Sequence, residues 1–589
     1  MAETKMKTKG GSFLLQSPAP ADVFTPEDLS EEQKMIAQST REYAAKAHGK
    51  LKEIEQDKPR YSRPLMKEAG DLGILGLEIP EEFGGLGLDK VTATVASEEM
   101  TRAGSFAVTL MAHTGIGTLP IVYFGTKEQK AKYLPKLATG EWVAAYALTE
   151  PGSGSDALGA RTTAKLTEDG KYWVLNGTKQ WITNSAFADL FVVYAKVDGE
   201  KFSAFIVERS FLGVSVGPEE DKMGLHASST CTLILEDVQV PVENLLGEIG
   251  RGHVIAFNIL NIGRWKLGAA TSGSSKFVLE VAAQYAKTRA QFGKPIAEFR
   301  AIQQKLADMN VRTYVTESVA YRTAGLLDEA LGDLDLVNTD IKEAGKRIEE
   351  YAVECSINKV FGSEVFDFVV DEAVQIHGGY GYMNEYEVAT AYVDSRINRI
   401  FEGTNEINRL LIPGTLVRRT MKGELPLMKA MLGLQDELMS LTPFEDDGEP
   451  LAQERYMIER AKKVFLMLAG LGVQKYQMAL EGEQELLLGI ADIGIEIFAM
   501  ESAVLRALKA IAAGKPGLKP EMAQVYCQES FERIGMFARN IMPALEEEGD
   551  TLRTQLSILK RLLRYTPTNI VGLKRKVAER VLEKEGYVV

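Results

Sequence analysis

The chain has 589 residues, of which 45% are hydrophobic and 25% charged, and its 82 acidic and 68 basic residues give a net charge of -14. These are ordinary values for a globular protein, and at roughly 150 residues per domain the length predicts about three or four domains. They exclude collagen-like, disordered and disulfide-scaffold proteins. An acidic chain is also a poor candidate for general nucleic-acid binding, which needs a basic surface.

Cysteines and histidines are few and scattered. Cys231, Cys355 and Cys527 lie far apart, and the five histidines form no HxxxH or HExxH pair. This pattern favours a reducing compartment and predicts no metal site. The apolar patch within residues 1–16 is too short for the core of a signal peptide, and no arginine precedes Arg41. We therefore expect a soluble protein of a bacterial cytoplasm, with the mitochondrial matrix as the alternative.

Residues 26–140 have mostly helical periodicity. Thr25 and Pro26 supply a cap and a first-turn residue, so we expect the helices to begin there. The longest uncharged stretch, residues 103–126, contains four glycines, a histidine and a proline. This composition favours a buried helix and loop over a membrane span.

Residues 141–250 switch to a period of two, which is typical of strands. Two dipeptides in this region, Asp169-Gly170 and Asn176-Gly177, are strong hairpin signals. We expect an antiparallel β domain, folded as a small barrel or as two packed sheets.

The remaining chain is again helical, and we divide it into residues 251–420 and 421–589. The acidic segment 443–450 is typical of a linker, and the glycine- and proline-rich segment 514–520 of a loop. The predicted order along the chain is therefore α, β, α and an extra α region.

Two strand ends in the β region carry polar and small residues. The segment 146–156 (YALTEPGSGSD) ends a strand in a glycine-serine turn, where a ligand can approach the backbone. The segment 181–184 (WITN) ends a second strand with an aromatic and two polar groups. Taken singly, a plain structural turn explains the first segment equally well, and a core tryptophan is the commoner explanation of the second.

Two further motifs lie in the third region. The segment 375–382 (QIHGGYGY) follows a helical run, so it is not a dinucleotide fingerprint, and His377 alone is more often structural. The segment 396–409 (RIFEGTNEINR within it) places Glu402 between Phe401 and Gly403. Partial burial beside the aromatic ring would raise the pKa of this carboxyl toward the range of a general base, and a surface glutamate before a helix is the alternative.

In this order and at these separations, the motifs YALTEPGSGSD, QWITN, RAQFGKPI, QIHGGYGY and RIFEGTNEINR resemble the acyl-CoA dehydrogenase family over roughly residues 35–415. The resemblance implies an α+β fold: an N-terminal helical domain, a central antiparallel β domain, a helical domain of four-helix-bundle type, and here an extra helical C-terminal domain. It also implies an FAD enzyme of fatty-acid β-oxidation that introduces a trans double bond between the α and β carbons of an acyl-CoA thioester.

The resemblance assigns the catalytic role to Glu402, which removes the α proton while the β carbon delivers a hydride to the flavin. The thioester carbonyl is held by the backbone N–H of Glu402 and a flavin ribityl hydroxyl, which stabilise the developing enolate charge. Substrate contacts carried over are Ser155, Asn261, Arg264, Phe401 and Gly403, with Arg264 near the CoA phosphates.

The implied FAD contacts fall into three groups. One lies in the β domain, one reaches the FAD or its diphosphate across a subunit interface, and one follows the base. They are, in that order, Tyr146, Leu148, Thr149, Gly154, Ser155, Trp181, Ile182 and Thr183; Arg289, Gln291, Phe292, Gln375, His377, Gly378 and Gly379; and Thr404, Asn405 and Glu406.

Three positions depart from the family pattern. Arg300 stands where many members have a glutamine beside the diphosphate, and Lys196 where some have a serine that contacts CoA. Gly263 occupies the place where the isovaleryl and long-chain branches carry their base. Because a glycine cannot remove a proton, this favours Glu402.

The chain continues well past residue 415, a layout that resembles the very-long-chain branch. That resemblance implies a homodimer in place of a tetramer and, in some members, membrane association. Residues 551–564 carry leucines at helical spacing with basic residues between them. Such a helix can lie on an anionic membrane or pack on its own protein, and we favour packing.

The expected function is dehydrogenation of long-chain acyl-CoA, with electrons passed to an electron-transferring flavoprotein. Two alternatives remain at this point: the same chemistry on medium or short chains, and a non-catalytic partner in respiratory-complex assembly on the same scaffold. The expected partners are the acyl-CoA substrate, the electron-transferring flavoprotein and a second copy of the chain, without nucleic acid.

Overall fold

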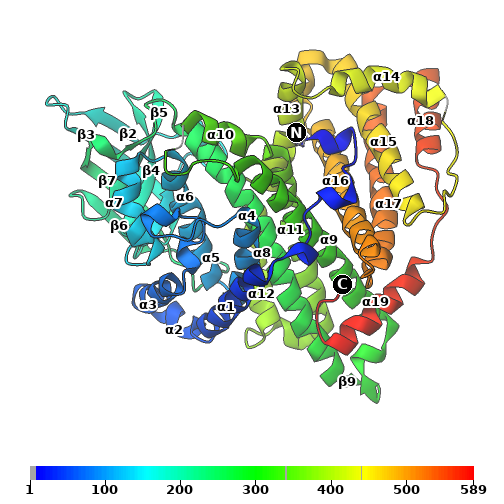
Figure 1. Ribbon diagram of the computed structural model, residues 1–589, viewed down its shortest axis with the longest axis horizontal. Helices are drawn as coiled ribbons and strands as arrows, with labels where there is room; N and C mark the ends of the chain where they lie inside the picture. The colour runs from blue at the N-terminus through cyan, green and yellow to red at the C-terminus, as the bar shows by residue number, and fades with distance from the viewer. Residues whose placement is uncertain (1–7, 339–340, 440) are drawn as a thin grey trace, which may run out of the picture.

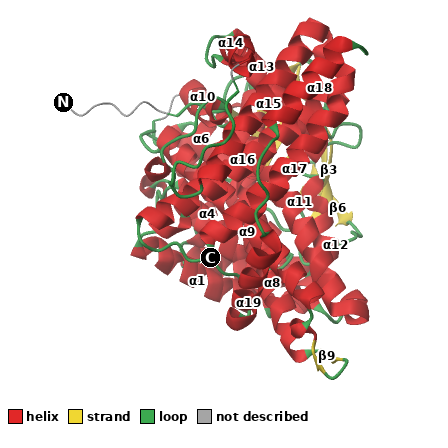
Figure 2. Cartoon of the chain, turned by 90° about the vertical axis from the view of Figure 1, so that its right-hand side faces the viewer, coloured by secondary structure: helices red, strands yellow, loops and turns green. Residues whose placement is uncertain are grey.

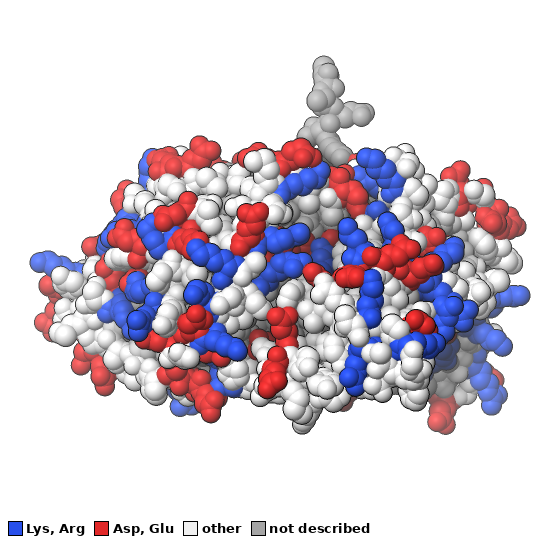
Figure 3. Space-filling view, turned by 90° about the horizontal axis from the view of Figure 1, so that it is seen from below, with Lys and Arg blue, Asp and Glu red and all other residues white. Residues whose placement is uncertain are grey.

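The computed structural model describes residues 8–338, 341–439 and 441–589. The first seven residues of the segment tested for a signal peptide lie outside this part. A β-sheet occupies one end of the molecule, long helices run through its middle, and a second helical block lies at the other end (Figure 1). Acidic and basic side chains are interspersed over the face seen in Figure 3, with no field of one sign.

The N-terminal helices begin later than the sequence suggested. Thr25 and Asp28 form a capping box around a single short turn, and the first long helix is capped by Ser30 and Gln33 in the same way. The helices of this region are α1 Glu31–His48, α2 Leu51–Gln56, α3 Lys58–Asp71, α4 Lys90–Met100, α5 Phe106–Ala112, α6 Leu119–Phe124 and α7 Lys127–Ala138.

The uncharged stretch folds as α5, a π-helical turn at His113–Gly117, and α6. Among the described residues, Phe106–Phe124 is long and apolar enough to cross a membrane, but 72% of this window is buried inside the protein. His113 explains part of that burial. Its Nδ1 accepts the Ala144 N–H and its Nε2 donates to the Leu137 carbonyl, both at 3.0 Å, which ties the helices to the first strand.

The described strands of the middle region form one sheet in the order β6-β7-β3-β2-β4-β5-β8, with β1 paired to β4. The strands form one sheet and not two separate sheets, and it curls so that Trp173 of β3 packs against Phe205 of β5, which is not its neighbour in the order, with ring centroids 5.8 Å apart. The sheet is mixed because β1 and β2 both pair with β4 in parallel. The strands are β1 Ala144–Ala147, β2 Thr163–Leu166, β3 Tyr172–Thr183, β4 Leu190–Val197, β5 Lys201–Glu208, β6 Val214–Glu219, β7 Thr230–Pro241 and β8 Leu245–Leu246.

Only one of the two hairpin signals is used as a turn. Asp169-Gly170 connects β2 to β3, with Gly170 at a φ of +68°. Asn176-Gly177 instead lies inside β3, where Gly177 marks a shift in the pairing with β7 and Asn176 exchanges hydrogen bonds with Asp237. The dipeptide therefore forms a bulge, which is the other common use of glycine in a strand.

Four long helices, α8, α9, α11 and α13, pack together as the expected four-helix bundle. Short elements connect them, including the β9–β10 hairpin that projects from one end of the molecule (Figure 1). The elements are α8 Gly252–Thr288, β9 Ala290–Gln291, β10 Lys294–Pro295, α9 Arg300–Leu331, α10 Ile341–Glu349, α11 Ala352–His377, α12 Glu387–Ser395 and α13 Asn405–Met421.

The extra C-terminal helices share one hydrophobic core with this bundle, because buried residues of α8, α9 and α11 belong to the same cluster as those of α15, α16 and α17. Figure 2 shows the helices side by side, with β3 and β6 at one edge. The helices are α14 Leu427–Met439, α15 Ala452–Tyr476, α16 Gln484–Ala512, α17 Lys519–Leu545, α18 Asp550–Leu562 and α19 Ile570–Lys584.

Both ends of the described chain fold back on these helices. Phe13 packs edge-on against Phe498 of α16, with ring centroids 4.9 Å apart. Near the other end, Val588 exchanges two 3.0 Å hydrogen bonds with the buried amide of Asn310 on α9. The extra helices are thus fastened to the bundle by segments distant in sequence.

Candidate active site

Glu402 lies in the short loop that precedes α13, and its backbone is held in an unusual conformation. Glu402 and Gly403 have φ values of +59° and +79°, and the first is costly for a residue with a side chain. Arg264 Nε donates to the Glu402 carbonyl at 3.1 Å, and Asn408 Nδ2 donates to the Glu402 and Gly403 carbonyls at 3.3 and 2.8 Å. These contacts fix the loop.

The Glu402 carboxyl points toward α8, where Gly263 leaves room for it. A Cβ atom at position 263 would lie 2.6 Å from Oε2, so any larger residue would displace the carboxyl. Oε2 is buried without a hydrogen-bond partner among the described residues. Burial raises the pKa of Glu402 to about 7, against the opposing charges of Arg264 and Lys359. The group is therefore suited to accept a proton near neutral pH.

The two predicted strand ends of the β domain lie next to each other. Gln180 N–H donates to the Thr149 carbonyl at 2.9 Å, and Lys179 Nζ donates to the Leu148 carbonyl at 3.1 Å. A bulge between Lys179 and Ile182 puts Trp181 at a φ of +57° and leaves its side chain 63% exposed. The bulge therefore presents an aromatic face at the sheet edge.

This edge fits a planar cofactor. The exposed Trp181 indole supplies an apolar face beside Thr149, and a Cβ at Gly154 would meet nothing within 4 Å. Ser155 is exposed in the same turn, and Tyr146, on the adjoining strand, lies within electrostatic reach of Glu402. The edge and the base loop are thus brought to the same region, as a flavin reaction requires.

Two residues expected at this edge turn their side chains inward. Ile182 is 2% exposed within the core of the sheet, and Leu148 is 8% exposed within the core that joins the sheet to the helices. Their side chains therefore do not face a ligand, and any contact they make with FAD must come from the backbone.

The second group of expected FAD contacts lies on a different part of the surface. Arg289 stacks over the Tyr380 ring at 5.1 Å, and Phe292, at the tip of the β9–β10 hairpin, is 92% exposed. Gln291, Gln375, Gly378 and Gly379 are exposed as well. Figure 1 places this hairpin well away from β3, so this group does not complete the edge of its own chain.

His377 does not share this exposure. Its ring is 5% exposed, stacks on Tyr285 at 3.9 Å and has Nδ1 2.8 Å from the Ala373 carbonyl. Burial lowers the pKa of His377, so the ring is neutral at physiological pH. The His377 ring therefore packs inside the C-terminal end of α11, whereas Gly378 and Gly379, which follow it, are exposed at the surface.

Two expected substrate contacts, Arg264 and Asn261, are buried beside the base loop. Arg264 is 6% exposed, and besides Glu402 it donates to Asn261 Oδ1 at 2.9 Å, which occupies the buried Asn261 as well. In this structure Arg264 and Asn261 support the base loop, and a contact of Arg264 with the CoA phosphates stays a prediction, as do the substrate contacts of Phe401 and Gly403. Arg300 is exposed and donates to Gln303 Oε1 at 2.7 Å.

Thr404, Asn405 and Glu406, which are expected to contact the flavin, have different surroundings. Thr404 caps α13 by accepting the Ile407 N–H at 3.3 Å, and Glu406 is exposed. Asn405 is 3% exposed, and its amide is engaged on both atoms by Lys359, Ser363 and Glu364. The Asn405 side chain therefore attaches the start of α13 to α11.

Sequence reasoning missed Asn408 and Lys359. Both are fully buried polar residues, one beneath the Glu402 loop and the other beside Asn405. Asn408 lies in the RIFEGTNEINR motif, so its position six residues after the base was a usable signal. Lys359 lies in the middle of α11, and nothing in its local sequence marks it.

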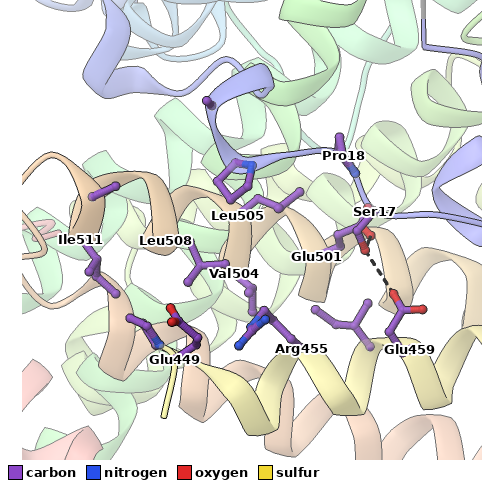
Figure 4. A pocket seen from close by; sticks show the side chains of 15 residues that line it. Ser17, Pro18, Glu449, Arg455, Glu459, Glu501, Val504, Leu505, Leu508 and Ile511 are labelled. Atoms are coloured by element: carbon purple, nitrogen blue, oxygen red, sulfur yellow. Dashed lines mark hydrogen bonds between the residues drawn. The ribbon is translucent and has the colours of Figure 1, made fainter. Parts of the chain in front are cut away.

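A cavity lies elsewhere, between the segment at Ser17–Ala21 and helices α15 and α16 (Figure 4). It has a volume of about 760 Å³ and apolar walls. Several of its polar side chains are paired with one another or with neighbours: Ser17 with Glu459 and Glu501, and Arg455 with Asp447. None of the residues around Glu402 lines it, so it is not part of this site.

Four models of the acyl-CoA dehydrogenase family match the chain. They describe its N-terminal domain at residues 30–141, its middle domain at 145–238, and two C-terminal domains at 250–416 and 460–561. The last match shows that the extra helices are themselves a known part of the family.

Individual relatives agree with this. A probable acyl-CoA dehydrogenase of Bacillus subtilis is 55% identical over 99% of this chain and 98% of its own. A very long-chain specific mitochondrial enzyme of Bos taurus is 36% identical over 86% of this chain and 79% of its own. The crystal structure of a Bacillus anthracis acyl-CoA dehydrogenase complexed with FAD is 57% identical with a TM-score of 0.97, covering 99% of this chain and 100% of that one. The chain belongs to the acyl-CoA dehydrogenase family and is an FAD-dependent enzyme.

Proposed function

We propose that this enzyme dehydrogenates long-chain acyl-CoA to trans-2-enoyl-CoA in fatty-acid β-oxidation, with Glu402 as the base, and passes its electrons to an electron-transferring flavoprotein. The observation that carries the proposal is the buried Glu402 Oε2, which has no described partner and occupies the space above Gly263. A buried, unpaired carboxyl with a raised pKa marks a candidate acid–base group. Glu354 has the same features, and the RIFEGTNEINR motif is what selects Glu402 over it.

The residues around Glu402 divide the work. Glu402 accepts the α proton, and the burial of its Oε2 atom limits the access of water to that atom. Arg264 and Asn408 hold the loop carbonyls, so the Glu402 backbone stays in place to bind the thioester oxygen. The Trp181 face and the glycine-serine turn orient the isoalloxazine ring. Bound FAD supplies the acceptor for the hydride of the β carbon.

The long-chain assignment rests on the extra helices and on the bovine relative, which is described as very long-chain specific. Medium or short chains remain the enzymatic alternative. A non-catalytic assembly partner would need no base. Because the chain keeps Glu402 and the contacts that hold its loop, we favour the enzyme over this alternative. The exposed β9–β10 hairpin supports a homodimer in which Arg289 and Phe292 of each subunit approach the FAD of the other.

Anaerobic mixing with butyryl-, octanoyl- and palmitoyl-CoA tests the substrate class through the visible absorbance of the flavin. We expect bleaching with all substrates that fit and the fastest bleaching with palmitoyl-CoA. Bleaching only with a short chain would keep the chemistry and overturn the long-chain assignment. A flavin that never bleaches would favour the assembly-partner alternative. Reoxidation of the bleached enzyme by added electron-transferring flavoprotein tests the acceptor.

A further inference from the structure

Hydrogen bonds from the Asn405 side chain attach the end of the Glu402 loop to α11. Its Oδ1 accepts from Lys359 Nζ at 2.6 Å and from Ser363 Oγ at 3.3 Å, and its Nδ2 donates to Ser363 Oγ and Glu364 Oε1, both at 3.0 Å. Ser363 Oγ also lies 3.0 Å from the Val360 carbonyl, so its single proton serves one of these two acceptors, and the other contacts engage both ends of the buried Asn405 amide. Because Asn405 is the first residue of α13, its position sets where the loop ends.

Glu364 connects Asn405 to Arg409 of α13, and Arg409 in turn contacts Asp492 of α16. The same Oε1 that accepts from Asn405 accepts from Arg409 NH1 at 2.7 Å, and Oε2 accepts from Arg409 NH2 at 2.9 Å. The remaining arm of the guanidinium, Nε, donates to Asp492 Oδ1 at 2.7 Å. A planar guanidinium that makes hydrogen bonds from all three of its nitrogens has one orientation. Asp492 therefore helps to orient the Arg409 guanidinium, and the guanidinium in turn orients the Glu364 carboxylate.

Asp492 belongs to the extra C-terminal helices, whereas the other members of this chain of contacts belong to the bundle. The two parts share one hydrophobic core, and α13 packs directly against α16. Arg409 and Asp492 are only 16% and 21% exposed, so solvent screens their interaction little. The Arg409–Asp492 pair therefore lies in a packed interface between α13 and α16, whereas Glu364, the next residue of the link, is 42% exposed.

We propose that Asp492 is a positioning residue for the catalytic base, through which the extra C-terminal helices hold the Glu402 loop in its reactive geometry by way of Arg409, Glu364 and Asn405. This inference rests on the proposed role of Glu402. It gives the extra helices a part in the chemistry of their own subunit, because reacting groups displaced by about 1 Å lose much of their rate.

Asp492→Ala tests the link, with Glu496→Ala as the matched control. Glu496 lies one turn further along α16 and accepts from Arg533, Tyr526 and Ser530 within the extra helices, so its loss disturbs the same helix without touching the loop. The readouts are the limiting rate of anaerobic flavin bleaching by acyl-CoA, the acyl-CoA concentration that gives half of that rate, and the thermal midpoint.

For Asp492→Ala we expect the limiting rate to fall by about 2- to 30-fold, the range for residues that act through a network. The half-saturating concentration should stay near the wild-type value, and Asp492→Glu should restore most of the rate. Glu496→Ala should lower the thermal midpoint and keep the rate. Equal rates for the two alanine variants would overturn the proposal.

Arg409→Lys provides a second route if Asp492→Ala does not fold. It keeps the charge but cannot bridge Glu364 and Asp492, so the same loss of rate with unchanged half-saturation is expected. A wild-type rate in Arg409→Lys would also overturn the proposal. Failure of the proposed function is recognised separately, because wild-type enzyme would then not bleach or Glu402→Gln would bleach as fast as wild type.

Discussion

At the scale of single residues, the site is built from groups that lie far apart in the chain and meet at one peptide. Arg264 reaches the Glu402 carbonyl across 138 positions of sequence, and Asn408 reaches it from the first turn of α13. Gly263 contributes by having no side chain. The left-handed backbone at Glu402 persists because these contacts over-determine it.

The space at Gly263 predicts the effect of the smallest added side chain. In Gly263→Ala the new Cβ would lie 2.6 Å from Glu402 Oε2 and must push the carboxyl aside. We expect the bleaching rate to fall by about 10- to 100-fold with FAD still bound, since displacement of the reacting group is costly. Gly414→Ala, at an exposed helical position where a Cβ meets nothing within 4 Å, should keep the rate. Stopped-flow absorbance of both variants decides this.

The raised pKa of Glu402 predicts a pH dependence of stability. The folded protein holds this proton more tightly than the unfolded chain, so stability falls as pH rises from the ordinary value of 4.5 to about 7. The groups facing Glu402 are Arg264, Lys359 and Tyr146. We expect Glu402→Gln to be more stable than wild type at pH 7.5, by on the order of 2 kcal/mol.

Thermal unfolding at two pH values measures this difference. The gain should shrink at pH 5, where wild type keeps the proton in the folded state and the penalty is mostly absent. A gain that is the same at both pH values would mean that the carboxyl is not buried as described.

At the scale of elements, α18 shows how an amphipathic pattern is resolved by its neighbours. Leu559 and Leu562 are buried in the shared core, and Leu552, Leu556 and Leu563 pack against it. The basic residues between them face outward. The leucine stripe is thus covered by the protein itself, which leaves it no face to insert into a membrane.

Leu559→Ala should therefore behave as a core substitution. Removing a side chain that is 1% exposed should cost about 2–5 kcal/mol, measured as a lowered midpoint in denaturant. Arg553→Gln, on the exposed face of the same helix, should change stability by less than about 0.5 kcal/mol. Flotation with anionic vesicles at low salt should leave wild-type protein at the bottom of the gradient, and its rise would show that a different surface binds lipid.

At the scale of the whole molecule, one buried arginine joins three distant segments. Arg506 of α16 is 2% exposed and pairs with Glu317 of α9 at 2.6 Å and with Glu27 of the N-terminal segment at 2.8 Å. The hydroxyl of Tyr587, close to the C-terminal end, donates to the same Glu317 at 2.6 Å. The extra helices are therefore connected to the bundle by charge as well as by the shared core.

Arg506→Gln should be strongly destabilising because it leaves Glu317 buried with less of its compensating charge. The expected loss is about 3–5 kcal/mol, the range for removing one partner of a buried pair. Chemical denaturation monitored by flavin fluorescence and circular dichroism would measure it. A loss of less than about 1 kcal/mol would place this pair with exposed ion pairs, which contribute little.

The sequence was sufficient for features that depend on local pattern or on a recognised motif. Helical and strand regions, the four-helix bundle and the motif of Glu402 were all predictable in this way. Asn176-Gly177 was misjudged because a bulge and a hairpin use the same dipeptide, and only the partner strand decides between them. Arg264 and Lys359 could not be assigned because their contacts come from other elements.

The most direct test of the central claim is anaerobic flavin bleaching by palmitoyl-CoA in wild type and in Glu402→Gln. The amide keeps the shape of the side chain but cannot accept the α proton, so the variant should bind FAD and remain yellow. We expect its bleaching rate to be lower than that of wild type by at least about 100-fold, the usual contribution of a general base. Bleaching of the variant at the wild-type rate would contradict the assignment of Glu402 as the base.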